Sequence, residues 1–192
     1  MKTQHFDINK VNLHFTADNH FMHNNVIEYC GRPFDGLEDM NEQMINNWNN
    51  VVKEEDIVFV LGDFIFRGTQ KHWNYFISKL NGFIWLIKGN HDVEKAFPKH
   101  MSNKFTWIDG FLNIKVIDEE IDGKSQYVTL CHYPMLSWYQ SQRGSWQLFG
   151  HVHEKPVKHI TSNQLNVGVD IHDFVPISWN EVKTIITKQN LT

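Results

Sequence analysis

Apolar and polar residues along the first part of the chain follow alternating strand and helix patterns. Residues 11–17 alternate apolar and polar side chains, which is typical of a strand. Residues 37–52 place apolar side chains three or four positions apart, so they predict an amphipathic helix. Residues 56–61 form a continuous apolar run after one acid and predict a buried strand.

The same alternation continues for one more helix and strand. Thr69 is suited to cap a helix over residues 70–80, which carries its apolar side chains on one face. Residues 83–87 then predict a third strand. The first half of the chain therefore predicts a βαβαβ arrangement.

The second half of the chain is richer in strand patterns. Residues 112–121 and 126–130 flank the turn sequence Asp122-Gly123-Lys124, and an Asp-Gly pair between two strand patterns indicates a β-hairpin. Residues 146–149 and 165–169 predict two further short strands.

The last element, over residues 179–187, fits a strand or a short helix, and its β-branched residues favour a strand. We expect one domain spanning residues 1–192 with an α/β fold, in which two packed β-sheets form a sandwich flanked by helices (α/β/β/α). Loops that leave the carboxyl ends of the strands would gather at one rim.

Composition and charge narrow the classes of function. The net charge of −4 provides no bulk basic surface for a polyanion, so a small phosphorylated substrate fits better than long duplex DNA. Two cysteines are too few for a disulfide framework, and we expect reduced thiols. The sequence has neither a signal-peptide pattern nor an apolar run of about 18 residues, so we expect a cytoplasmic protein without a membrane partner.

Five short motifs rich in metal-ligand side chains follow the predicted strands. They are Asp18-Asn19-His20, Gly62-Asp63, Gly89-Asn90-His91-Asp92, Cys131-His132 and Gly150-His151-Val152-His153. Side chains two positions apart on an extended segment point the same way, so both Asp18 and His20 can grip one ion. His151 and His153 repeat this spacing and again face one way. The two oxygens of Asp63 could bridge two ions. Imidazole and oxygen donors suit manganese, iron or zinc, and the lack of thiolates argues against structural zinc.

Each motif alone has an ordinary explanation. An Asp-x-His triplet occurs by chance, an aspartate after a strand is often a turn residue, and His132 alone would more often be a structural histidine. Gly89-Asn90-His91-Asp92 could be a simple turn. Their joint occurrence after successive strands favours a metal centre.

Taken together, the motifs resemble those of the calcineurin-like metallophosphoesterase superfamily. Residues 18–24, 166–170 and 176–178 are also similar to those of its small bacterial and phage members. The resemblance implies two divalent metal ions, with manganese expected first and iron, zinc, nickel or magnesium as alternatives. It implies one ion held by Asp18, His20, Asp63 and His153, and a second held by Asp63, Asn90, His132 and His151, with Asp63 as the bridge.

The resemblance also assigns catalytic roles. His91 would touch the substrate and protonate the leaving oxygen as a general acid, and Asp92 would accept a hydrogen bond from His91 and fix its orientation. The ions would activate a water as hydroxide and neutralise charge on the phosphoryl oxygens. The implied activity is phosphoester hydrolysis, with a phosphodiester favoured.

Residues around these motifs are candidates for binding substrate. Arg67 lies in Gly62-Asp63-x-x-x-Arg67-Gly68, which resembles the motif of phosphoprotein phosphatases whose arginine grips phosphate; a solvated turn arginine is the alternative. Phe66 stands where those enzymes have an acid, which weakens that assignment. His23 could line the pocket or be a loop histidine, and Asn90 would also face substrate. Tyr133, Trp138 and Tyr139 could wall the pocket or form an exposed aromatic loop.

Several other functions stay open. A phosphomonoesterase or protein phosphatase would use the same ligands, and the substrate could be a nucleotide. A nuclease would need a basic groove, which the acidic balance disfavours without ruling nucleic acid out. A binding scaffold that had lost its chemistry would lack some ligands or the acid His91, and the sequence retains them all.

Overall fold

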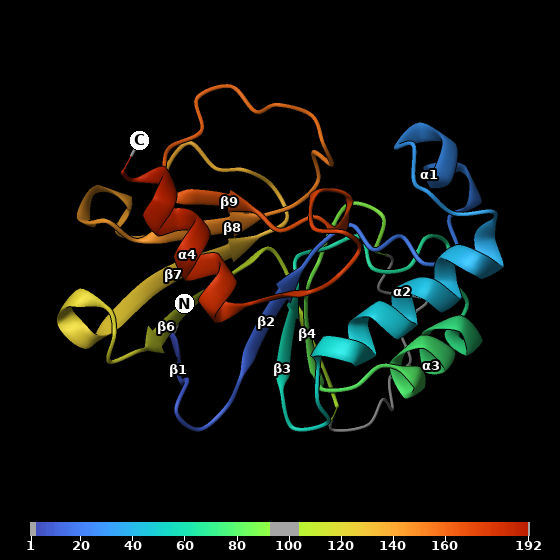
Figure 1. Ribbon diagram of the computed structural model, residues 1–192, viewed down its shortest axis with the longest axis horizontal. Helices are drawn as coiled ribbons and strands as arrows, with labels where there is room; N and C mark the ends of the chain where they lie inside the picture. The colour runs from blue at the N-terminus through green and yellow to red at the C-terminus, as the bar shows by residue number, and fades with distance from the viewer. Residues whose placement is uncertain (1–2, 93–103, 192) are drawn as a thin grey trace.

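Two five-stranded β-sheets pack against each other in the computed structural model, which describes residues 3–92 and 104–191 (Figure 1). The first sheet has the strand order β1-β6-β7-β8-β9 and the second has the order β10-β2-β3-β4-β5. The strands are β1 (Gln4–Asp7), β2 (Leu13–Thr16), β3 (Ile57–Val60), β4 (Phe83–Ile87), β5 (Phe105–Ile108), β6 (Phe111–Ile117), β7 (Ser125–Cys131), β8 (Trp146–Phe149), β9 (Gln164–Asn166) and β10 (Ile177–Ser178). The predicted α/β fold with two sheets is confirmed.

The second sheet contains the predicted βαβαβ unit. Strands β2, β3, β4 and β5 run parallel, and helices α2 (Leu37–Val51) and α3 (Gln70–Lys79) connect the first three. Figure 1 shows both helices on the same side of this sheet. Thr69 is the N-cap of α3 as predicted, and its backbone N–H donates to His72 Nδ1 at 3.2 Å. Parallel strands bring the carboxyl ends of β2, β3 and β4 to one edge.

Two apolar clusters hold these layers together. The one under α2 and α3 contains Met40, Trp48 and Trp73, all buried. The other fills the space between the sheets, where Phe15 of β2 shares a cluster with Ile114 and Leu148 of the first sheet. Burial of these large side chains supplies the main driving force for folding.

The C-terminal segment differs from the prediction. We expected residues 179–187 to favour a strand, but they lie in helix α4 (Trp179–Gln189). Ser178 and Glu181 form a capping box, in which Ser178 N donates to Glu181 Oε2 at 2.7 Å, and this box sets the helix start. Trp179, Val182 and Ile186, spaced three and four apart, join the cluster between the sheets. Capping and this apolar face outweigh the β-branched residues.

In the part of the chain that the structure describes, the helix α1 (Asn24–Tyr29) and the strands β1, β5 and β10 were not predicted. The predicted hairpin is confirmed as β6 and β7, which pair antiparallel around a turn where Gly123 has φ +75°. Strand β6 ends at Ile117, four residues earlier than expected, because Asp118 leaves the ladder and its carboxylate accepts from Trp179 Nε1 at 2.8 Å.

Within the described ranges, every helix is too short or too polar to cross a membrane.

Candidate metal centre

The five predicted motifs meet at one rim, at the carboxyl ends of β2, β3, β4, β7 and β8. Backbone hydrogen bonds tie these loops together. Asp18 N donates to Gly62 O at 3.0 Å, and Gly150 N donates to His132 O at 3.0 Å. His151 N donates to both carboxylate oxygens of Asp18, at 2.8 and 3.1 Å, which joins the two sheets. The expected gathering of loops at strand ends is therefore observed.

Most of the predicted ligands have an unusual backbone conformation. Five of them have positive φ, between 52° and 72°: Asp18, His20, Asp63, His151 and His153. Residues other than glycine seldom adopt this left-handed region, although aspartate and histidine do so more often than most. The bonds between the loops hold these residues in place, and the sharp turns aim their side chains into a common space.

Three motif glycines make room for the ligands. A Cβ added at Gly62 would collide with the His132 ring, and one at Gly89 would collide with Asp63. A Cβ at Gly150 would meet Ala17 Cβ and the Asp18 carboxylate. The glycines are needed because the strands and loops approach each other too closely for any side chain.

Asp63 lies at the centre of the cluster. Its Oδ2 lies 3.6 Å from His20 Nε2 and 3.5 Å from His132 Nε2. Its Oδ1 accepts a hydrogen bond from His91 N at 2.8 Å, which fixes the carboxylate. One carboxylate oxygen thus lies close to two imidazoles, His20 and His132, that the family resemblance assigns to different ions.

The other predicted ligands surround this carboxylate. Ligand atoms of Asp18, His20 and His153 lie within 4.8 Å of one another, and those of Asp18, Asp63 and His132 form a second such group. The His151 ring lies 5.0 Å from the His132 ring, measured between centroids, and Asn90 Oδ1 lies 3.0 Å from His132 Nε2. All seven predicted ligands are thus brought together.

The protonation state of His132 indicates that the space between the ligands suits a cation. Its Nδ1 lies 2.7 Å from Leu61 O, which accepts hydrogen bonds only, so Nδ1 carries a proton. Burial lowers the pKa of His132, so the ring is neutral and its Nε2 presents a lone pair. That lone pair faces the oxygens of Asn90 and Asp63. Converging lone pairs repel one another unless a cation lies between them.

The buried ionisable residues also indicate a site for a cation. Burial raises the pKa of Asp18 to about 7 and also raises that of Asp63, because removal from water disfavours a charged carboxylate. Burial lowers the pKa of His20 to about 2, and its Nδ1 has no hydrogen-bond partner among the described residues. Carboxylates, an amide oxygen and neutral imidazoles are donors for divalent transition metals, so the residues fit such ions.

A buried ion pair between Arg32 and Asp170 lies behind the predicted ligands, and it was not predicted from the sequence. Asp170 Oδ2 lies 2.6 Å from His153 Nδ1, which leaves His153 Nε2 for a metal. Arg32 binds both carboxylate oxygens of Asp170, at 2.8 and 3.1 Å, and donates to the carbonyls of Asp18 and Asn19. Asp170 lies in a segment noted for its resemblance to small family members, but Arg32 follows Gly31 in a loop that carries no motif.

Asp92 does not orient His91 as expected. Its carboxylate accepts from three backbone N–H groups, those of Gly89 at 2.8 Å, Asp63 at 2.7 Å and Phe64 at 3.0 Å. The predicted bond from the His91 ring is not found among the described residues, because the Asp92 side chain turns toward its own loop and the loop of Asp63. Asp92 therefore fixes two motif loops to each other, and His91 is exposed at the rim.

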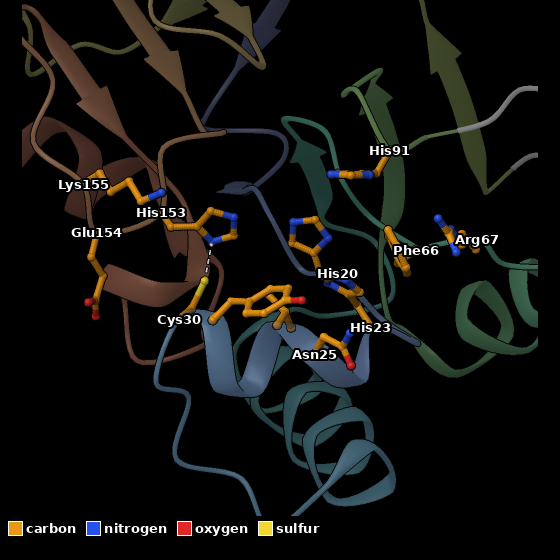
Figure 2. Close-up of a pocket in the computed structure, with 12 residues that line it drawn as sticks. His20, His23, Asn25, Cys30, Phe66, Arg67, His91, His153, Glu154 and Lys155 are labelled. Atoms are coloured by element: carbon orange, nitrogen blue, oxygen red, sulfur yellow. Dashed lines mark hydrogen bonds between the residues drawn. The ribbon is translucent and has the colours of Figure 1, made fainter.

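A cavity of about 620 Å³ opens beside the ligands, lined by His20, His153 and His91 and by the candidates Arg67 and His23. In Figure 2, Arg67 lies on the far side of Phe66 from His20 and His153. Its guanidinium carbon lies 5.0 Å from the centroid of the Phe66 ring. Arg67 is thus a residue of the cavity wall, one ring removed from the metal ligands.

The aromatic residues after His132 divide between two places. The Tyr133 ring lies 4.7 Å from the His151 ring and 4.9 Å from the His132 ring, so Tyr133 borders the candidate metal centre. Trp138 and Tyr139 line a separate cavity with Phe111 and Thr129. Cys30 and Cys131 are free thiols, and Cys30 Sγ lies 3.4 Å from His153 Nδ1.

The sequence and the fold of this chain were compared with those of known proteins. The family described as calcineurin-like phosphoesterase matches residues 11–133. An uncharacterized protein of Methanocaldococcus jannaschii is 34% identical over 92% of this chain and 92% of its own length. Gene 66 proteins of two Mycobacterium phages are 28% and 27% identical, over 91% and 83% of this chain and 96% and 86% of their own lengths. A solved structure from Aquifex aeolicus, of a protein of unknown function, has the same fold, with a TM-score of 0.65, 23% identity and coverage of 91% of this chain and 99% of that chain.

Proposed function

The chain belongs to the calcineurin-like phosphoesterase family, and from that premise we propose that it is a two-metal phosphodiesterase with His91 as general acid. The observation that carries the proposal is the position of Asp63 Oδ2, 3.6 Å from His20 Nε2 and 3.5 Å from His132 Nε2. A carboxylate oxygen so placed suits a bridge between two ions. When bound, the ions supply a nucleophile from water near neutral pH and neutralise charge on the phosphoryl oxygens.

We assign the metal-binding and acid roles to the residues as follows. Asp18, His20, Asp63 and His153 would hold one ion, and Asp63, Asn90, His132 and His151 would hold the other. Manganese is the ion we expect, because imidazole, amide and carboxylate donors suit it. His91 is exposed at the rim and lines the cavity, where its imidazole donates a proton to the leaving oxygen.

Two features favour a diester over a monoester. The cavity extends from the ligands past His91 to Arg67, which leaves space for a second ester group. A phosphomonoester carries about −1.5 to −2 charges at neutral pH, and a diester carries one fewer ionisable oxygen. Among the described residues that line the cavity, the lysine and arginine side chains are Arg67 and Lys155, and the acidic Glu154 also lines it.

The test compares two aryl phosphates. Metal-free protein is reloaded with manganese, and the hydrolysis of bis(p-nitrophenyl) phosphate is measured beside that of p-nitrophenyl phosphate. We expect faster turnover of the diester, and loss of activity on both substrates in Asp63→Asn. Asp109→Asn, a change at an exposed acid outside the site, is the matched control and keeps full activity.

Each other result assigns a different function. Faster turnover of the monoester makes the protein a phosphomonoesterase, including the protein phosphatase alternative. Cleavage of single-stranded or duplex DNA with strong salt dependence makes it a nuclease. Bound metal without turnover of any ester leaves a non-catalytic scaffold.

A further inference from the structure

We propose that the cavity beside the metal centre binds nucleotides, with the base stacked on Tyr29 next to the ring pair of Phe66 and His23. This inference rests on the proposed function, since it identifies the organic group of the ester that the centre hydrolyses. We name these three residues the aromatic wall. His23 and Tyr29 lie at the two ends of α1, and Phe66 lies in the loop after β3.

The aromatic wall lines the cavity together with the candidate catalytic residues. The rings of His23 and Phe66 lie 3.7 Å apart between centroids, and the Phe66 ring meets His91 at 5.2 Å. The Tyr29 ring lies 6.4 Å from that of His23. A continuous aromatic surface therefore leads from His91 to the end of α1.

Tyr29 is the member of the aromatic wall with a free surface. Its side chain is 73% exposed, although it lies at the edge of a cavity and belongs to a helix of six residues. Because the Tyr29 ring is so exposed, it contributes little to the hydrophobic core. Val26 is the residue of α1 that is buried. Its face is available to a planar ligand, and aromatic side chains bind bases by stacking.

Charge around the aromatic wall suits a ligand with phosphate. Arg67 packs on Phe66 at 5.0 Å, so a guanidinium stands beside the stacking surface. Figure 2 shows Lys155 on the opposite side of His153 from Arg67. A nucleotide has both a planar base and anionic oxygens for such a surface.

Two probes that differ only in the base test this inference. Manganese-loaded protein is titrated by calorimetry with adenosine 5′-monophosphate and, separately, with ribose 5-phosphate. We expect the nucleotide to bind roughly ten times more tightly, because stacking strengthens binding by this order. Equal affinity for the two probes overturns the inference.

Variants locate the preference. Tyr29→Leu and Phe66→Leu should each remove most of the advantage in affinity that the nucleotide has over ribose 5-phosphate. Tyr75→Leu, at an exposed tyrosine of α3, is the matched control and should keep the advantage. An advantage that survives in Tyr29→Leu and Phe66→Leu, or that Tyr75→Leu abolishes equally, also overturns the inference.

The outcome is separable from that of the proposed function. Hydrolysis of bis(p-nitrophenyl) phosphate with equal affinity for the two probes supports the phosphodiesterase and refutes the nucleotide cavity. A nucleotide advantage in a protein that hydrolyses no ester refutes the phosphodiesterase and leaves a nucleotide-binding cavity.

Discussion

Asp18 links metal binding to pH. It is fully buried, and burial raises its pKa to about 7 in the metal-free protein. The carboxyl group holds a proton below that pH, and an ion must displace this proton before it binds. Manganese affinity should therefore weaken as the pH falls below about 7, and above that pH the protonation of Asp18 should no longer affect it.

Calorimetry in buffers with different ionisation enthalpies measures this proton. One pH unit below the pKa, binding should release close to one proton from Asp18, and one unit above it the release should nearly vanish. Asp18→Asn should abolish the difference between the two conditions. Proton release that is the same in the wild type at both pH values would contradict the assignment.

His91 should matter most when the leaving group is poor. His91→Gln should lower kcat by about 10²–10⁴ for an ester with a phenol or alcohol leaving group, because that oxygen needs a proton. The loss should be smaller for p-nitrophenol, which leaves readily as an anion. Manganese content, measured by atomic absorption, should not change. His5→Gln, at an exposed histidine of β1, is the control. A loss that is equal for both leaving groups removes His91 from the role of acid.

The candidate ligands could be predicted from the sequence because each one follows a predicted strand. Prediction failed for Asp92, since side-chain direction within a turn depends on which backbone N–H groups a neighbouring loop presents. It also failed for Arg32 and Asp170, which are 138 residues apart in the sequence and meet only in the fold.

At the scale of elements, a glycine lets the loop after β8 approach the loop after β2. Gly150→Ala should place a methyl group against Ala17 and the Asp18 carboxylate, destabilising the protein by about 1–3 kcal/mol and displacing Asp18 from its position. Thermal unfolding and manganese titration measure the two effects. Gly36→Ala is the control, since a Cβ there has open space. Gly150→Ala with the wild-type affinity for manganese would refute this view.

The loop after α1 and the segment after β9 support the ligand His153. Asp170→Asn should weaken manganese binding by about 10–100-fold, because the carboxylate that orients His153 and pairs with Arg32 is lost. Asp118→Asn is a matched control, since Asp118 is also buried and paired, with Lys183. That control should lose stability but keep its metal affinity. Equal affinities in the two variants would mean that Asp170 is only structural.

Long periodic elements were predictable and short ones were not. Helices α2 and α3 each bury a regular face against the same cluster, so their pattern is visible in the sequence. Strand β10 has two residues, and α1 buries only Val26, so neither leaves a periodic pattern. The sequence favours a strand where helix α4 forms, because the capping box begins at Ser178, just before the β-branched residues that are typical of a strand.

At the scale of the whole molecule, the candidate centre joins the two sheets. Asp18, Asp63 and Asn90 follow strands of the second sheet, and His132 and His151 follow strands of the first. Ions held between them would add stability to the folded state by binding it selectively. The family match and the similar fold of the Aquifex aeolicus protein agree with an arrangement in which two sheets share one rim.

The position of bound manganese tests the central claim most directly. Crystals grown with excess manganese are measured near the manganese absorption edge, and an anomalous difference map is calculated. We predict two peaks roughly 3.5–4 Å apart on either side of Asp63 Oδ2, one near His20 and the other near His132. A single peak, or none beside Asp63, would contradict the account.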